Sequence, residues 1–142
     1  MSAPYTGRCV CGAVTLKIAG EAIMTRQCWC RQCQQIAAGG PTQNATFQSD
    51  DVVASGSLAT TTWFAASGNL LTLSFCPECG THIYAQSSAR IHLKTVRLGA
   101  IDEPHGLKPS IAIWTEEAPD WAKIDPAMEQ WPQYPPPPPG AS

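Results

Sequence analysis

Short segments in which apolar and polar residues alternate recur along the chain, as in Val14-Thr-Leu16-Lys-Ile18. Alternation with a period of two is typical of a strand with one buried face, because successive side chains of a strand point to opposite sides. The candidate strands cover residues 14–18, 60–64, 71–75, 81–84, 90–94 and 111–114. Turn-forming residues such as Ser67-Gly68-Asn69 separate them. The pattern predicts a mainly β protein built from antiparallel sheets.

A helix is expected at only one place, residues 31–38, where Gly39-Gly40-Pro41 would end it. The end of the chain differs from the rest, because six of its thirteen prolines fall in residues 132–142. Such a run is typical of a polyproline II segment or of a disordered tail. A length of 142 residues suits one compact domain. We therefore expect one domain over residues 1–126 and a proline-rich tail over 127–142.

The formal net charge is −2, from 9 basic and 11 acidic residues. Because the chain has no basic stripe to hold a phosphate backbone, nucleic acid is not expected as a partner. No stretch has the length and hydrophobicity of a membrane span, and the first residues do not resemble a secretory signal. We expect a cytoplasmic protein with no membrane partner. In that reducing compartment, closely spaced cysteines are more often metal ligands or catalytic groups than disulfides.

The seven cysteines fall into three clusters, and none stands alone. The clusters are Cys9-x-Cys11, Cys28-x-Cys30-x-x-Cys33 and Cys76-x-x-Cys79. Thiolates are ligands of zinc and other soft metals. A structural zinc site is closed by four protein ligands, whereas a catalytic site has three and keeps one position open. Seven cysteines therefore divide naturally into one closed site and one open site.

One of the clusters has the form of a zinc knuckle. Cys76-Pro-Glu-Cys79-Gly80 places two thiolates on one tight turn, and its glycine permits a backbone with positive φ. Cys9-x-Cys11-Gly12 is the natural partner, since it also ends in glycine and leads into a strand. These two clusters are predicted to form the closed site of four thiolates.

The cluster Cys28-x-Cys30-x-x-Cys33 would then hold a second metal. The fourth position would go to water, a substrate or a residue other than cysteine, as a reactive metal requires. Two alternatives stay open. The pair Cys30 and Cys33 could instead join the later knuckle in a single zinc ribbon, or His82 could complete the three-cysteine site.

These three motifs, in this order, resemble the family of glutathione-dependent formaldehyde-activating enzymes, which is grouped with the centromere protein V domain. The similarity extends over most of the chain. It rests on Gly7-x-Cys9-x-Cys11-Gly12-Ala-Val, Cys28-x-Cys30-x-x-Cys33 and Phe75-Cys76-Pro-x-Cys79-Gly80-Thr, with weaker matches at Leu98-Gly-Ala-Ile-Asp102, Ile113-Trp114 and Trp121.

The resemblance implies a β-tent fold of packed antiparallel sheets with zinc knuckles, and two zinc ions per chain. The structural zinc would be held by Cys9, Cys11, Cys76 and Cys79, and the catalytic zinc by Cys28, Cys30 and Cys33. The implied activity is that of a carbon–sulfur lyase, which joins formaldehyde to glutathione to give S-(hydroxymethyl)glutathione. Its partners are a small thiol such as glutathione and a small aldehyde. At two positions relatives often have histidine, where this chain has Trp29 and Ala112.

A zinc ion held by three thiolates has a net charge of about −1 and is a weak electrophile, but it can hold an incoming thiol as its thiolate. Such a thiolate could add to a small aldehyde. Glutathione carries two carboxylates, and Arg8, Arg26 and Arg31 lie beside the cysteine motifs. Arg31 is the first candidate for substrate binding, and Trp29 is a candidate to cover the site. The alternative function is a non-catalytic, zinc-stabilised binding module.

Overall fold

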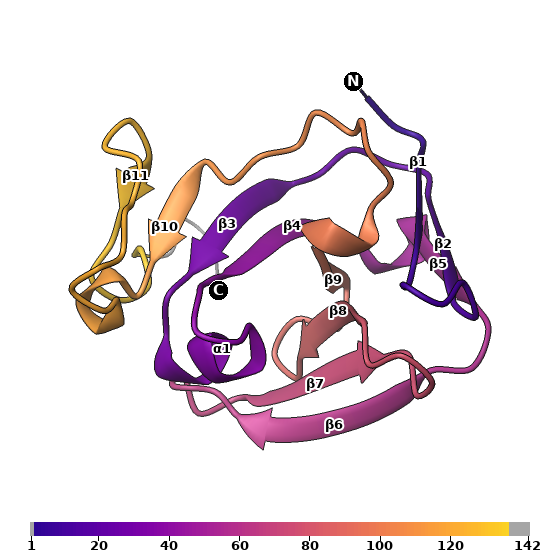
Figure 1. Cartoon of the computed structure of the whole chain (residues 1–142), viewed down its shortest axis with the longest axis horizontal. Coiled ribbons are helices and arrows are strands. Elements are labelled where there is room, and N and C mark those ends of the chain that lie inside the picture. The colour runs from indigo at the N-terminus through magenta and orange to yellow at the C-terminus, as the bar shows by residue number, and fades with distance from the viewer. Residues whose placement is uncertain (1, 137–142) are drawn as a thin grey trace.

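The computed structural model describes residues 2–136, which form eleven strands and one α-helix (Figure 1). The elements are, in chain order, β1 (Tyr5–Arg8), β2 (Thr15–Ile18), β3 (Met24–Cys28), α1 (Arg31–Ile36), β4 (Thr42–Gln48), β5 (Val52–Ser55), β6 (Ala59–Phe64), β7 (Leu70–Phe75), β8 (His82–Ser87), β9 (Leu93–Arg97), β10 (Ile111–Ile113) and β11 (Glu129–Gln130). Single 3-10 turns cover Ser49–Asp51, Leu98–Ala100 and Thr115–Glu117. The mainly β class predicted from the sequence is confirmed.

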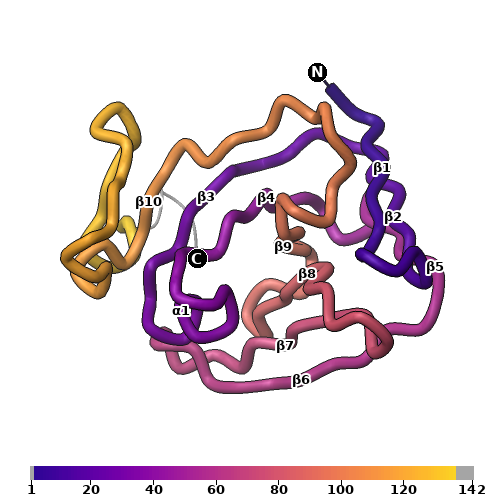
Figure 2. The backbone as a smooth tube through the Cα atoms, in the orientation of Figure 1, coloured from indigo at the N-terminus to yellow at the C-terminus, as the bar shows by residue number. Residues whose placement is uncertain are grey.

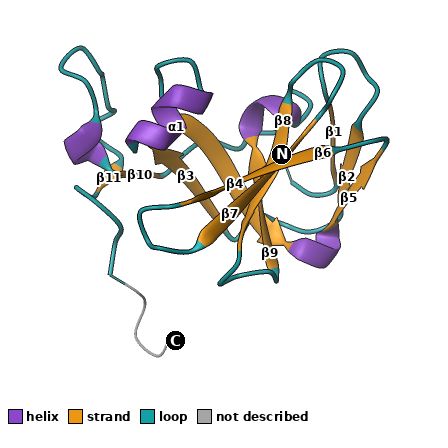
Figure 3. Cartoon of the chain, turned by 90° about the horizontal axis from the view of Figure 1, so that it is seen from below, coloured by secondary structure: helices purple, strands orange, loops and turns teal. Residues whose placement is uncertain are grey.

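The strands form two sheets. One has three strands in the order β1-β2-β5, and the other has eight in the order β11-β10-β3-β4-β9-β8-β7-β6. The larger sheet curls, so that β6 and β7 run below β3 and β4 in the view of Figures 1 and 2. Helix α1 lies between these two pairs of strands, at one side of the molecule. The side chain of Gln32 on α1 donates a hydrogen bond to the carbonyl of Phe64 at the end of β6, over 2.9 Å. Seen from below, β10 and β11 lie at one end of the molecule and the three-stranded sheet at the other (Figure 3).

The main core lies between the two sheets. Burial on β2 alternates as its sequence predicts, with Leu16 and Ile18 almost fully buried. They belong to the same apolar cluster as Phe47 and Val96 from the eight-stranded sheet. Each such side chain contributes about 1.5–3 kcal/mol when it is removed from water. One face of β4 and β9 therefore packs into the main core, and the opposite face can carry functional side chains.

Two sequence predictions about the strands need correction. The strand expected at residues 90–94 begins only at Leu93, because the preceding residues form a turn in which Arg90 donates its N–H to the carbonyl of Ser87. The sheets are also not wholly antiparallel. Strand β10 pairs in parallel with both β3 and β11, which is possible because long connections separate these strands in the chain.

The helix and the C-terminal segment follow the sequence in part. Helix α1 starts at the expected residue and ends at Ile36, two residues before the expected end. Within the expected proline-rich tail, β11 pairs with β10, and Trp131 packs against the apolar cluster of Cys28, Ile113 and Trp114. Residues 137–142, which include most of the proline run, lie outside the described residues. The domain boundary at residue 126 stays a prediction.

Candidate metal centres and active site

Four thiols from two distant parts of the chain meet at one point. Cys9 and Cys11 follow β1, Cys76 and Cys79 lie in the turn between β7 and β8, and all four sulfur atoms lie within 4.8 Å of one another. The Sγ of Cys11 is 3.6 Å from that of Cys9 and 3.7 Å from that of Cys76. A tetrahedral zinc site with Zn–S bonds of about 2.3 Å requires sulfur atoms about 3.8 Å apart. This four-cysteine cluster therefore fits a closed metal site.

The two turns that carry these thiols have the same backbone design. The N–H of Gly12 donates to the carbonyl of Cys9, and the N–H of Gly80 donates to the carbonyl of Cys76. Both glycines have a positive φ, +80° and +78°, which a residue with a side chain adopts at a cost. Each cysteine motif therefore needs its final glycine, because only that backbone conformation forms the turn that orients the two thiols.

Thr81 joins the two halves of the four-cysteine cluster. Its hydroxyl accepts a hydrogen bond from the N–H of Val10 and lies 3.1 Å from the Sγ of Cys79. The hydrogen bond from Thr81 lowers the pKa of Cys79 to about 5. This thiol is therefore ionised at neutral pH, as a metal ligand must be.

The three remaining thiols form the second, three-cysteine cluster. Cys28 ends β3, Cys30 is the N-cap residue of α1 and Cys33 lies in the helix, and their sulfur atoms lie within 4.8 Å of one another. The Sγ of Cys30 accepts a hydrogen bond from the backbone N–H of Cys33 over 3.4 Å. Within residues 2–136, no histidine or carboxylate joins this group. The cluster can therefore hold a metal through three thiolates and leave one position for another ligand.

A polar row lies beside this cluster on the eight-stranded sheet. Asn44 on β4 is in register with Arg26 on β3 and with Arg97 on β9, and Thr42 is in register with Cys28. Since side chains two residues apart share a face of a strand, all five lie on the face opposite the main core. We call this the thiol face.

Hydrogen bonds on the thiol face lead from Arg97 to a thiol. The guanidinium Nη1 of Arg97 donates to Oδ1 of Asn44, whose amide nitrogen donates to the hydroxyl of Thr42 over 3.0 Å. That hydroxyl donates to the Sγ of Cys33 over 3.2 Å. Each hydrogen bond in this series donates in the direction of the sulfur, so the series stabilises Cys33 as a thiolate.

The pKa values within the three-cysteine cluster diverge in consequence. A hydrogen bond from Cys28 is the largest cause that lowers the pKa of Cys33, to about 3, and the Thr42 hydroxyl and the charge of Arg97 act in the same direction. The pKa of Cys28 is raised, chiefly because it shares a hydrogen bond with Cys30. Without a metal, the cluster thus keeps a proton on Cys28 that a metal ion would displace.

Tyr134, in the C-terminal segment, packs on Trp114, which belongs to the same apolar cluster as Cys28. Its ring packs edge-on against Trp114 at 5.4 Å, and the N–H of Trp114 donates to the carbonyl of Gln133. Burial raises the pKa of Tyr134, and thiolates at Cys28 and Cys30, as in a metal-bound cluster, would raise it further. The phenol therefore stays protonated at neutral pH.

The two residues that the sequence proposed for substrate binding differ in their surroundings. Arg31 is exposed, and its guanidinium donates to the side chain of Gln34 over 3.3 Å. Trp29 is buried, its indole N–H donates to Oε1 of Gln27 over 2.7 Å, and its ring packs against Trp121. Because Gln27 alternates with Cys28 along β3, these contacts hold Trp29 on the side away from the thiol face. Their roles in substrate binding stay predictions.

Ala112, where relatives often have histidine, is also on that other side. It pairs with Gln27 in the parallel ladder between β10 and β3 and is fully buried. Neighbours in a ladder share a face of the sheet, so Ala112 and Trp29 both lie on the side of Gln27. The two departures from the family pattern therefore leave the polar groups of the thiol face intact.

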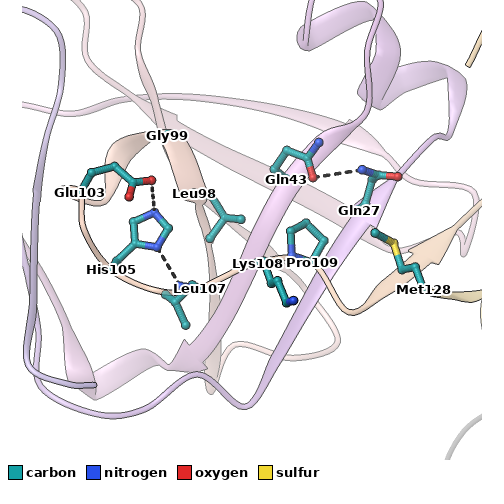
Figure 4. Close-up of a pocket in the computed structure, with 10 residues that line it drawn as sticks. All are labelled: Gln27, Gln43, Leu98, Gly99, Glu103, His105, Leu107, Lys108, Pro109 and Met128. Carbon is teal, nitrogen blue, oxygen red and sulfur yellow. Dashed lines mark hydrogen bonds and ion pairs between the residues drawn. The ribbon is translucent and has the colours of Figure 1, made fainter. Parts of the chain in front are cut away.

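A pocket of about 380 Å³ occupies the same side as Gln27 (Figure 4). The amide of Gln27 donates to that of Gln43, and Nε2 of His105 lies 3.0 Å from a carboxylate oxygen of Glu103. The pocket is lined by Gln27, Gln43, Leu98, Gly99, Glu103, His105, Leu107, Lys108, Pro109 and Met128. None of the seven cysteines lines it, so it is separate from the candidate metal centres.

Sequence reasoning did not find Arg97, Asn44, Thr42 or Tyr134. The available signal was on β4, where Thr42, Asn44 and Thr46 alternate with other residues in a pattern typical of a solvent-exposed face. In the structure all three are buried. Buried polar side chains need partners: Thr42 and Asn44 contact each other, an arginine and a thiol, and the hydroxyl of Thr46 lies 3.2 Å from that of Thr95.

The chain matches one protein family along most of its length. Residues 4–117 match the model of the glutathione-dependent formaldehyde-activating enzyme family, and the chain belongs to that family. A crystal structure of a Rhodobacter sphaeroides protein has a similar fold, with a TM-score of 0.57 and 17% sequence identity over 89% of this chain and 98% of the other. No curated protein is similar enough in sequence to be recognised as a relative. Among residues 2–136, no helix is long and apolar enough to cross a membrane.

Proposed function

We propose that this chain binds two zinc ions and catalyses the addition of glutathione, or another small thiol, to formaldehyde or a related aldehyde. The four-cysteine cluster would hold a structural zinc, and the three-cysteine cluster a catalytic zinc. One observation carries the proposal, namely three clustered thiols with no fourth protein ligand among residues 2–136, beside a row of buried polar groups. The family points to the same reaction. The closely spaced cysteines favour a reducing, cytoplasmic compartment, and the family supports the carbon–sulfur lyase class.

The reaction is balanced without an oxidant or a reductant. The thiol sulfur forms a bond to the carbonyl carbon, the electron pair of the C=O double bond moves to oxygen, and that oxygen takes the proton that the thiol has lost. The reverse reaction breaks the same carbon–sulfur bond. A zinc ion bound by three thiolates would favour the ionised form of the substrate thiol.

The residues in and around the three-cysteine cluster have separate roles in this proposal. Cys28, Cys30 and Cys33 bind the metal, and Thr42 orients Cys33 through its hydroxyl. Tyr134, a protonated phenol that packs on Trp114, would donate a hydrogen bond to the aldehyde oxygen as negative charge develops there. Proximity supplies much of the rate enhancement, since it converts an encounter of two molecules into a reaction within one complex.

The binding of a thiol at the second cluster provides the decisive test. In protein whose second site is loaded with cobalt, added glutathione is expected to change the visible absorption, and the zinc protein is expected to accelerate adduct formation above the uncatalysed rate. Cys30→Ser should abolish both effects. If both metals are present but glutathione changes neither the spectrum nor the rate, the chain is a zinc-stabilised binding module and the enzyme proposal is wrong.

A further inference from the structure

Strand β6 forms an outer edge of the eight-stranded sheet. It stands last in the strand order, and it lies at the lower border of the molecule in Figure 1. Its neighbour β7 pairs with it along its whole length, from Ala59 opposite Phe75 to Phe64 opposite Leu70. Among residues 2–136, no strand pairs with the other side of β6. That side can therefore accept a further strand.

Hydrogen bonding in the hairpin between β6 and β7 shows which backbone groups point outward. The N–H of Ala65, directly after β6, donates to the carbonyl of Asn69 over 3.0 Å. Hydrogen-bonded and non-hydrogen-bonded pairs alternate along an antiparallel ladder. The backbone of Thr61 is therefore bonded to β7, whereas Thr60 and Thr62 turn their N–H and C=O groups to the outside.

The outward groups of β6 divide into a bonded end and a free stretch. At the end of the strand, the carbonyl of Phe64 accepts a hydrogen bond from the side chain of Gln32 on α1. Within the described part of the chain, no group bonds to the outward N–H or C=O of Thr60 or Thr62. Both threonine side chains are exposed as well. The backbone groups of these two residues are thus available to another strand.

The other sheet edges of the described residues are short, charged or covered, as is usual for native edges. Strand β1 is bridged through Gly7 to Ile101, and β5 has four residues, one of whose carbonyls accepts from Lys94. Strand β11 has two residues and contains Glu129. In contrast, β6 has six residues, and it lies in the longest stretch of the sequence without a charged residue, 52–77. Its free edge therefore lacks the usual protection against pairing.

We propose that the free edge of β6 pairs with the same edge of a second copy of this chain, in an antiparallel dimer whose two-fold axis passes beside Thr61. In this register Thr60 of each copy lies opposite Thr62 of the other, so that each free N–H meets a free C=O. A register centred on Thr62 would need the carbonyl of Phe64, which Gln32 already binds. The strand has no charge that would repel an identical strand or select a charged partner, so its chemistry fits a second copy.

Single cysteines test this register directly. In the proposed dimer the two copies of residue 61 form a non-hydrogen-bonded pair with Cα atoms about 4.5 Å apart, which a disulfide can bridge. The two copies of residue 60 are two residues out of register and about 8 Å apart, which is too far for a disulfide. After air oxidation of the zinc-loaded full chain, Thr61→Cys should give a disulfide-linked dimer on a non-reducing gel. The matched variant Thr60→Cys and the unmodified chain should give little.

Sedimentation of the full chain measures the association itself. The unmodified protein should approach twice the mass of one chain as its concentration rises. Thr62→Lys should raise the dissociation constant of the dimer by about 10-fold or more, because an edge lysine opposes strand pairing and its charge is repeated across the two-fold axis. Gln130→Lys adds the same charge to β11, at the other edge of the same sheet, and should change the constant by less than about 2-fold.

Three results would refute the proposal. A chain that stays monomeric at every concentration and is not linked through residue 61 would leave the edge to a partner other than a second copy. Equal linking of Thr60→Cys and Thr61→Cys would indicate random collision instead of a fixed register. A dimer that Thr62→Lys and Gln130→Lys weaken equally, or not at all, would lie at another surface. Circular dichroism and zinc content confirm that each variant is folded, and if Thr62→Lys is not, the two cysteine variants still decide the question.

Discussion

The two cysteine clusters should differ sharply in their importance for folding, and paired substitutions can measure the difference. Cys76 is fully buried and belongs to the main core cluster together with Cys9. Cys30 is half-buried and caps a helix of six residues. Cys76→Ser would remove a proposed ligand of the cluster that joins the two sheets, whereas Cys30→Ser would remove a proposed ligand beside one sheet only.

The magnitudes follow from the two environments. Structural zinc contributes about 10–16 kcal/mol to the folding of small zinc domains, which equals or exceeds the total stability of about 5–15 kcal/mol of an ordinary domain. Cys76→Ser is therefore expected to abolish cooperative unfolding. In Cys30→Ser the new hydroxyl can still accept the hydrogen bond from the N–H of Cys33, so the helix cap is kept. The loss should be no more than about 3 kcal/mol, or about 10 °C in Tm for a chain of this length.

Metal content by mass spectrometry and thermal unfolding by circular dichroism measure both effects. The unmodified chain should contain two zinc ions, and Cys30→Ser one, with a single unfolding transition. Cys30→Ala is the matched control for the cap and should be about 1 kcal/mol less stable than Cys30→Ser. A Cys76→Ser protein that melts within a few degrees of the unmodified chain, or a Cys30→Ser protein that loses both ions, would refute the assignment of structural and catalytic sites.

Three further predictions concern the stability of the fold and the role of Tyr134. The buried amide of Gln34 donates to two backbone carbonyls, so Gln34→Ala should lower the free energy of unfolding in urea by about 2–4 kcal/mol, while Gln35→Ala, at an exposed position, should leave it unchanged. A Cβ on Gly7 would lie 2.1 Å from a backbone oxygen, so Gly7→Ala should destabilise the protein by more than about 2 kcal/mol, whereas Gly99→Ala meets no atom within 4 Å and should be neutral in the same measurement. Tyr134→Phe removes the proposed hydrogen-bond donor and should lower kcat by about 10-fold with little change in thiol affinity; an unchanged kcat would exclude this role.

The sequence was most informative where structure is local. The alternation of β2 predicted its buried face correctly, because one side of that strand faces the core and the other faces solvent. Strand β4, in contrast, was not among the predicted strands. Both of its faces are buried, and Thr42 and Asn44 face a polar interior, so their polarity did not indicate exposure. Parallel pairing of β10 likewise depended on a partner that lies far away in the chain.

In the candidate site, too, the sequence determined the local features and the tertiary structure determined the rest. By themselves, the cysteine motifs determined which thiols share a turn, since ligands two or three residues apart are placed by local backbone geometry and by the glycines that follow them. Only the tertiary structure decided which cation faces the thiols. Arg31 is adjacent to the motif in sequence yet exposed, whereas Arg97 is brought to Cys33 by the registers of β3, β4 and β9. The direction of a side chain in a sheet depends on strand register, and register is fixed by packing across the whole fold.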